Sequence, residues 1–181
     1  FADPDCSSIR FWPINYRLGP FGYMAHPALS ADDPRGVSGN YGLLDQIAAL
    51  EGVRDNIRAF GGDPSNVTVF GERAGAQSVS ELMAAPDSRG LFHKGILQSG
   101  ASTYNTNILD AAIPGRLSMH QAGINFLQGI ADTDADAAML RSIPGPVLID
   151  QIANHPEFRD YLLPTADGVV IPEIIGAAIM Q

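Results

Sequence analysis

The stretch Phe60-Gly-Gly-Asp-Pro-Ser-Asn-Val-Thr-Val-Phe-Gly-Glu-Arg-Ala-Gly75 decides the fold class of this chain. Its β-branched run at 67–70 predicts a short strand, and a helix-forming segment follows the turn at 71–75. A strand that turns sharply into a helix, with small residues around the middle of the turn, is the layout of a nucleophile elbow. The middle position of this turn is Arg73, where that layout requires a serine.

The surrounding sequence predicts alternating helices and strands. Apolar residues recur at helical spacing through residues 41–60, and Gly61 is suited to close that helix. A strand, a helix and a second strand of these lengths predict parallel pairing through a right-handed crossover. Pro13 makes 9–16 a poor strand, because proline removes a ladder donor. The remaining predictions are a loop at 19–40, buried strands at 66–70 and 95–98, and a helix at 74–85 stopped by Pro86.

Composition places the chain among ordinary globular proteins. It has 181 residues, of which 45% are hydrophobic and 17% charged. The net charge of −9 argues against nucleic-acid binding, because phosphate contacts need clustered Lys and Arg. We see no membrane-spanning run and no signal-peptide pattern, and assign no compartment. The single cysteine, Cys6, excludes an internal disulfide and a multi-thiolate metal site, and we expect no cofactor.

The stretch 60–75 resembles the signature of the type-B carboxylesterase/lipase family, which includes the cholinesterases and has the α/β-hydrolase fold. Other segments are similar to that family in the same order, from about residue 14 to residue 180. Several motifs in order are much more specific than one elbow motif. The matching segments are Asn15-Tyr-Arg-Leu-Gly-Pro-Phe-Gly22, Gly39-Asn-Tyr-Gly-Leu-Leu-Asp-Gln46, Leu91-Phe-His-Lys94, Leu97-Gln-Ser-Gly100 and Pro164-Thr-Ala-Asp-Gly-Val-Val-Ile-Pro172.

This resemblance implies an α/β protein with a partial α/β-hydrolase fold: a parallel sheet core, flanking helices and a helical cap-like region. We expect a single partial domain over 1–181 that corresponds to the middle third of such an enzyme, with neither end a natural terminus. Its expected parts are the sheet core with the elbow at 1–100, a helical insertion at 101–160, and a loop and helix at 161–181. Short helices are predicted within the insertion at 117–130, 134–140 and 147–152.

The residues around Arg73 form the candidate site. The backbone N–H of Ala74 is the expected oxyanion donor, since it follows the nucleophile position. Gly71 and Gly75 are expected to leave room for the tight turn. Glu72 matches an acidic residue that the family has beside its nucleophile, and we expect it to pair locally with Arg73. Ser99 resembles a family serine that supports the triad acid by hydrogen bonding; an ordinary strand-end hydroxyl is the other interpretation.

Arg73 cannot replace the serine chemically. A guanidinium stays protonated and has no lone pair with which to attack a carbonyl. We also expect its backbone at positive φ, with about 1–3 kcal/mol of strain. No serine in the sequence has a glycine both two residues before it and two residues after it. Ser78 and Ser80 fall inside the predicted helix.

The resemblance places the remaining catalytic parts outside this sequence. The family's Gly-rich oxyanion loop would precede Phe1, and its triad acid and triad histidine would follow Gln181. Gly52 stands where the family has tryptophan, with an expected loss of about 3–5 kcal/mol if that position is in the core. The histidines are expected to be surface or packing residues: His26, His93, His120 and His155.

Two functions are compatible with this sequence. The first is a type-B carboxylesterase fragment whose ancestors hydrolysed small carboxylic esters through a serine acyl-enzyme, and which is inactive with Arg73. The alternative is a non-catalytic binding protein on the same scaffold, with no nucleic-acid partner and no membrane span.

Overall fold

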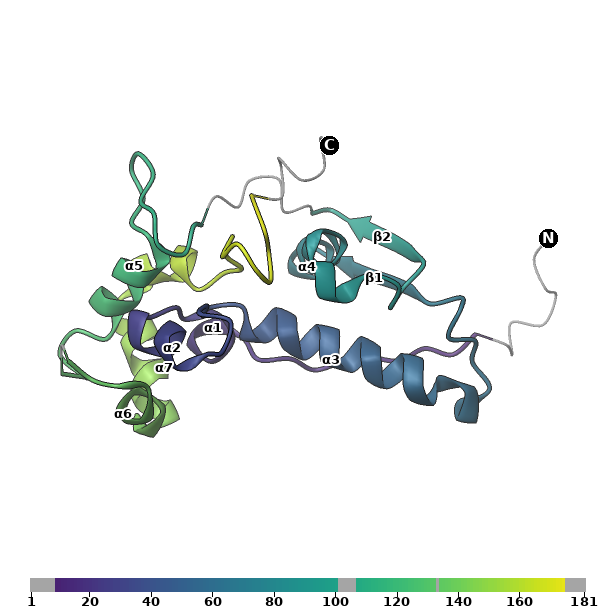
Figure 1. The fold of residues 1–181 in the computed structure, drawn as a ribbon, viewed down its shortest axis with the longest axis horizontal. Helices are drawn as coiled ribbons and strands as arrows, with labels where there is room; N and C mark the ends of the chain where they lie inside the picture. The colour runs from purple at the N-terminus through teal and green to yellow at the C-terminus, as the bar shows by residue number, and fades with distance from the viewer. Residues whose placement is uncertain (1–8, 101–106, 133, 175–181) are drawn as a thin grey trace.

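A computed structural model describes residues 9–100, 107–132 and 134–174 of the chain (Figure 1). A long helix, α3, has α4 and a small sheet lying along its length, and a group of short helices lies beyond its N-terminal end. Cys6, the chain ends and part of the helix predicted within 161–181 lie outside the described residues. The helices are α1 (Gly19–Tyr23), α2 (Pro27–Asp32), α3 (Tyr41–Asn56), α4 (Ala74–Ala84), α5 (Met119–Phe126), α6 (Ala137–Ser142) and α7 (Gly145–Asn154), and the strands are β1 (Thr68–Glu72) and β2 (Lys94–Gln98).

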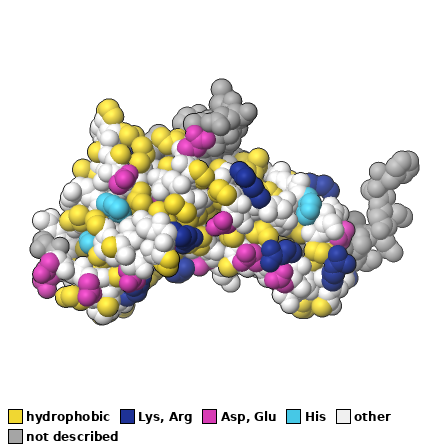
Figure 2. All heavy atoms as spheres, in the orientation of Figure 1, with side chains coloured by type: hydrophobic (Ala, Val, Ile, Leu, Met, Phe, Trp, Pro, Cys, Tyr) yellow, Lys and Arg dark blue, Asp and Glu magenta, His cyan; other side chains and the backbone are white. Residues whose placement is uncertain are grey.

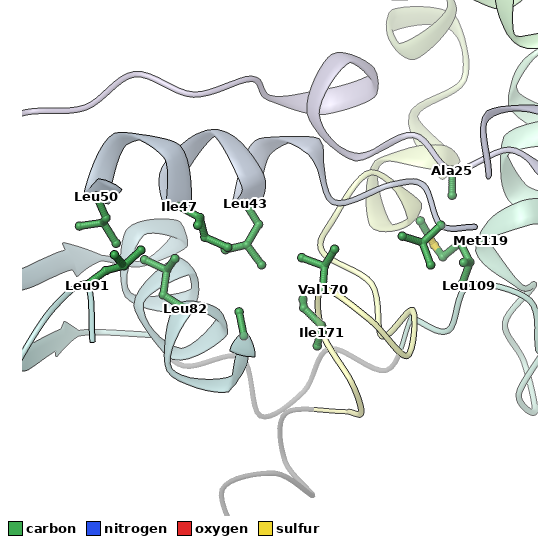
Figure 3. Close-up of a cluster of buried hydrophobic side chains, with 12 residues drawn as sticks. Ala25, Leu43, Ile47, Leu50, Leu82, Leu91, Leu109, Met119, Val170 and Ile171 are labelled. Atoms are coloured by element: carbon green, nitrogen blue, oxygen red, sulfur yellow. The ribbon is translucent and has the colours of Figure 1, made fainter. Parts of the chain in front are cut away.

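Helix α3 organises the main core, as its apolar spacing predicts. Leu43, Ile47 and Leu50 are buried on one side of it. They point toward Leu82 of α4 and Leu91 (Figure 3). After Asn56 the chain continues as a 3₁₀ turn, η2 (Ile57–Phe60). This helical segment ends at Gly61, which has φ +76°. Glycine takes this left-handed conformation without a Cβ penalty, which confirms the predicted helix stop.

The sheet of the described residues consists of β1 and β2, which pair in parallel with Thr68 opposite Lys94 and Glu72 opposite Gln98. Helix α4 connects them and packs against both strands, so the predicted parallel pairing through a crossover helix is confirmed. The prediction that both strands are buried is wrong. Side chains of β1 alternate between half-buried and exposed, and β2 is exposed throughout. The reason is that α4 covers one face of the sheet, whereas Phe70 and Ile96 remain 54% and 50% exposed.

The loop predicted at 19–40 instead contains α1 and α2. Both helices begin with a proline in the first turn, at Pro20 and Pro27, where the missing N–H costs nothing. His26 caps α2, because its Nδ1 accepts a hydrogen bond of 3.1 Å from the N–H of Ala28. The segment therefore holds two short helices, the second of them capped by His26, and only residues 33–40 form the turns that the composition predicts.

The predicted helices beyond residue 116 are confirmed as α5, α6 and α7. Ser118 and Asp136 cap α5 and α6 through their side-chain oxygens. A second apolar cluster joins α2 to these helices, and Phe126 is its largest fully buried side chain. No helix is found at 162–174, the described part that follows η5 (Pro156–Tyr161).

Position 52 is not in the core of the described residues, so the packing loss that was expected for a core position does not apply. Gly52 lies on the exposed side of α3, and a Cβ added there would meet no atom within 4 Å. Only the helix-propensity cost of glycine therefore applies, about 1 kcal/mol.

Candidate functional site

The turn between β1 and α4 has the backbone geometry that its sequence predicts. Strand β1 ends at Glu72, Arg73 has φ +50° and ψ −110°, and α4 begins at Ala74. A non-glycine residue at positive φ is uncommon and strained by about 1–3 kcal/mol. Two backbone hydrogen bonds of 2.9 Å hold this conformation: the N–H of Arg73 donates to the carbonyl of Gln98, and the carbonyl of Arg73 accepts from Gln77.

The two glycines of the turn differ in what they allow. A Cβ on Gly71 would collide with the backbone of Gly75, so β1 and α4 can approach this closely only with glycine at 71. A Cβ on Gly75 would meet no atom within 4 Å among the described residues. The predicted steric role therefore holds for Gly71 and not for Gly75.

The charge pair expected at the turn is present, but it is exposed. Arg73 Nε lies 3.3 Å from Glu72 Oε1, with the two side chains 82% and 57% exposed. Exposed pairs of this kind contribute about 0–1 kcal/mol. The Arg73 side chain is thus in solvent at the carboxyl end of β1, and the pair gives it little stabilisation.

The parallel register brings the end of β2 beside the turn. Ser99 follows β2 with φ +55°, and a Cβ on Gly100 would lie 2.6 Å from the carbonyl oxygen of Arg73. Ala74 is the first residue of α4, so its N–H has no partner within the helix. The carboxyl ends of parallel strands are where ligands bind in open α/β sheets. The structure therefore gathers Arg73, Ala74 and Ser99 at one edge.

The histidines form hydrogen bonds away from this turn. The N–H of Val67 donates to His93 Nδ1 over 3.2 Å, and His155 Nδ1 lies 3.2 Å from Glu157. His120 Nε2 lies 2.8 Å from Ser30 Oγ, bridging α5 and α2. These partners agree with the packing and surface roles that were predicted.

Burial controls the protonation of the two inner histidines. Desolvation lowers the pKa of His26 and that of His120, because a buried imidazolium loses hydration. The charge of His120 lowers the pKa of His26 further, whereas Asp110 partly opposes the shift in His120.

Other kinds of site are less well supported. Across the described ranges, no group of three or more His, Cys, Asp or Glu side chains could hold a metal ion. No helix in that part of the chain is long and apolar enough to cross a bilayer. On the face in Figure 2, basic and acidic side chains are interspersed.

A buried polar pair near the turn was not predicted. Gln46 Nε2 of α3 donates a 3.2 Å hydrogen bond to Ser78 Oγ of α4, and both side chains are buried. The available signal was a glutamine at 46 between apolar positions 43, 47 and 50, on the face of α3 that enters the core.

A parallel strand pair whose first strand turns at positive φ into the crossover helix agrees with a partial α/β-hydrolase fold, the fold of the solved esterases that superpose on this chain. The chain belongs to the carboxylesterase family, whose sequence model matches residues 13–179. The family resemblance read from the motifs is thereby confirmed.

Relatives with curated names cover different shares of the chain. It is 59% identical over 86 residues to the fumonisin B1 esterase of Sphingopyxis macrogoltabida, covering 48% of this chain and 16% of that protein. It is 50% identical over 112 residues to the para-nitrobenzyl esterase of Bacillus subtilis (strain 168), covering 62% of this chain and 22% of that protein. It is 35% identical over 175 residues to the human (Homo sapiens) cocaine esterase, covering 90% of this chain and 30% of that protein. The chain therefore spans less than a third of each relative's length.

Solved structures agree with the fold. A PNB esterase superposes with a TM-score of 0.75 at 38% identity, over 91% of this chain and 33% of that one. The Geobacillus stearothermophilus carboxylesterase gives a TM-score of 0.72 at 35% identity, over 89% of this chain and 33% of that one.

Proposed function

We propose that residues 68–84 are the nucleophile elbow of a serine carboxylesterase scaffold, and that the chain with Arg73 does not form an acyl-enzyme. The observation that carries this proposal is the backbone of Arg73, at φ +50° between β1 and α4. A nucleophile elbow uses such a strained turn to project its side chain from the strand end. Here the projected group is a guanidinium, which is 82% exposed and has no attacking lone pair.

In the ancestral reaction, the serine oxygen would attack the ester carbonyl and its proton would pass to a general base. The alcohol leaves, and water then hydrolyses the serine ester. The N–H of Ala74 would donate to the oxyanion, because it belongs to the residue after the nucleophile position. Ser99 would support the site from the end of β2. Replacing serine by arginine removes the first bond-forming step and leaves the Ala74 donor in place.

The proposed ancestral substrates are small carboxylic esters. Relatives carry names that specify para-nitrobenzyl esters, cocaine and fumonisin B1, so the family's named substrates differ widely. We therefore propose only the ester class for this chain. No cofactor is part of the proposed reaction.

A second candidate is a non-catalytic binding protein on the same scaffold. The turn keeps its backbone geometry although residue 73 is not a serine. This favours the second candidate, because the fold is kept while the nucleophile is lost. Deleting 101–160 from the chain should abolish partner binding in that case. A protein that aggregates in solution before any deletion would argue against this candidate.

Hydrolysis of p-nitrophenyl butyrate by the protein expressed from the complete reading frame tests the main proposal. We expect no turnover above that of heat-denatured protein. The matched variant Arg73→Ser restores the nucleophile, and a gain of turnover in it would show that the other catalytic parts are present. The proposal would be overturned by esterase activity that co-purifies with the unaltered protein and is blocked by a phosphonate.

A further inference from the structure

Helix α2 begins at a histidine cap that lies in a small polar core. His26 Nδ1 accepts a hydrogen bond of 3.1 Å from the N–H of Ala28 and is the side-chain cap of the helix. The N–H of His26 donates to Ser38 Oγ over 3.2 Å, and the hydroxyl of Ser38 lies 3.3 Å from the carbonyl oxygen of His26. Both residues are buried, so the backbone on either side of the cap is fixed and the imidazole has little access to water.

The hydrogen bond to Ala28 determines how the His26 ring is protonated. A backbone N–H can only donate, so Nδ1 of His26 carries a lone pair and the neutral ring carries its proton on Nε2. A second proton can therefore be added only at Nδ1, where it would point at the N–H of Ala28. Protonation replaces a hydrogen bond by a contact between two donors, and the charged ring has to leave the cap.

The neighbouring His120 does not have this restriction. Its Nε2 lies 2.8 Å from Ser30 Oγ, which lies 2.7 Å from Ser38 Oγ. A hydroxyl group both donates and accepts, so Ser30 can bond the neutral or the charged form of His120. The acid-sensitive contact in this polar core is therefore the cap at His26.

The charges around α2 act in the same direction. Burial lowers the pKa of His26, and the charge of His120 on α5 lowers it further. Asp110 opposes the effect of burial on the pKa of His120, which favours the charge that repels a proton on His26. The charged side chains at the C-terminal end of α2 are already in ion pairs, Arg141 with Asp32 and Arg35 with Asp33. A closed cap therefore requires a neutral His26, and it opens as the pH falls below about 6.5.

Loss of the cap would reach the second apolar cluster, because Leu29 of α2 is buried there with Phe126 and Leu148. Helix α2 has six residues, so its first turn is more than half of the helix. We propose that His26 is an acid-sensitive cap: when it takes up a proton, α2 opens and releases Leu29 while the rest of the chain stays folded. This device does not depend on residue 73 or on the proposed ester chemistry.

Hydrogen–deuterium exchange mass spectrometry of the protein expressed from the complete reading frame tests the proposal. The rates are divided by the intrinsic rates, and residues 27–32 of α2 are compared with residues 43–50 of α3. We expect the protection of α2 to fall by about 2- to 30-fold from about pH 7.5 to about pH 5, the effect of losing one N-cap. Helix α2 should also exchange faster than α3 at the lower pH, because it opens locally.

Matched variants assign the effect to one ring. His26→Asn and His26→Ser supply good N-caps that do not titrate in this range, so the protection of α2 should then be equal at the two pH values. His120→Gln leaves the cap in place and should keep most of the fall. The proposal would be overturned by an equal fall in the two His26 variants, or by loss of the fall in His120→Gln alone. In the unaltered protein, constant protection of α2, or exchange of α2 only together with α3, would also overturn it.

Discussion

Replacing Arg73 by glycine should stabilise the fold, although it removes an ion pair. Glycine adopts φ +50° without the strain of about 1–3 kcal/mol that arginine bears. Against this, glycine costs about 0.4–1 kcal/mol through the entropy of the unfolded chain. Loss of the Glu72 pair costs about 0–1 kcal/mol, because both side chains are more than half exposed. The net expectation is a gain of about 1 kcal/mol in the free energy of unfolding.

Urea denaturation and thermal melting measure this change. A gain of about 1 kcal/mol raises Tm by about 2–4 °C for a chain of this size. Arg89→Gly is the matched control, since Arg89 is exposed with φ −60° and should lose stability on becoming glycine. Equal losses in both variants would refute the assignment of strain to position 73.

Three further changes test the packing and the electrostatics. Leu43→Ala should cost about 2–5 kcal/mol, because Leu43 is fully buried, whereas Met83→Ala on the exposed surface of α4 should cost well under that. Asn40→Ala should cost about 2–4 kcal/mol, because its buried amide bonds Thr165 through both its oxygen and its nitrogen. The urea midpoint should fall as the pH drops below about 6.5, since His26 and His120 have lowered pKa values when folded.

The sign of the pH effect follows from proton linkage. Below a pH of about 6.5 the unfolded chain binds protons at these histidines before the folded chain does, so acid favours unfolding. Protonation of His26 also removes the Nδ1 lone pair that accepts from Ala28 at the start of α2. A urea midpoint that stays constant between pH 7.5 and pH 5 would contradict the burial of the neutral imidazoles. Equal costs for Leu43→Ala and Met83→Ala would contradict the position of the core, and an unchanged midpoint in Asn40→Ala would contradict its buried hydrogen bonds.

The sequence predicted those elements that are determined by local periodicity. Helix α3, its glycine stop and the β1–α4–β2 order follow from apolar spacing and turn residues within each segment. Helices α1 and α2 were missed, because proline both interrupts a helix and begins one, and the deciding contacts are tertiary. Burial of the strands was misjudged since it depends on what covers the sheet and not on the strand residues.

The site was predictable to a similar extent. The position and backbone conformation of Arg73 follow from the motif, and the ion pair with Glu72 follows from adjacency. Its exposure was not predictable, because exposure depends on how far the β1 end projects from its neighbours.

Covalent labelling shows whether any residue of the turn 71–75 acts as a nucleophile. A fluorophosphonate forms a stable bond with an activated serine at a nucleophile elbow and has no such reaction with a guanidinium. Intact mass spectrometry of the protein after treatment, followed by peptide mapping, detects and places any adduct. We expect an unchanged mass and an unmodified peptide containing Arg73. A stoichiometric adduct on any residue of the turn 71–75, or on Ser78 or Ser80, would contradict it.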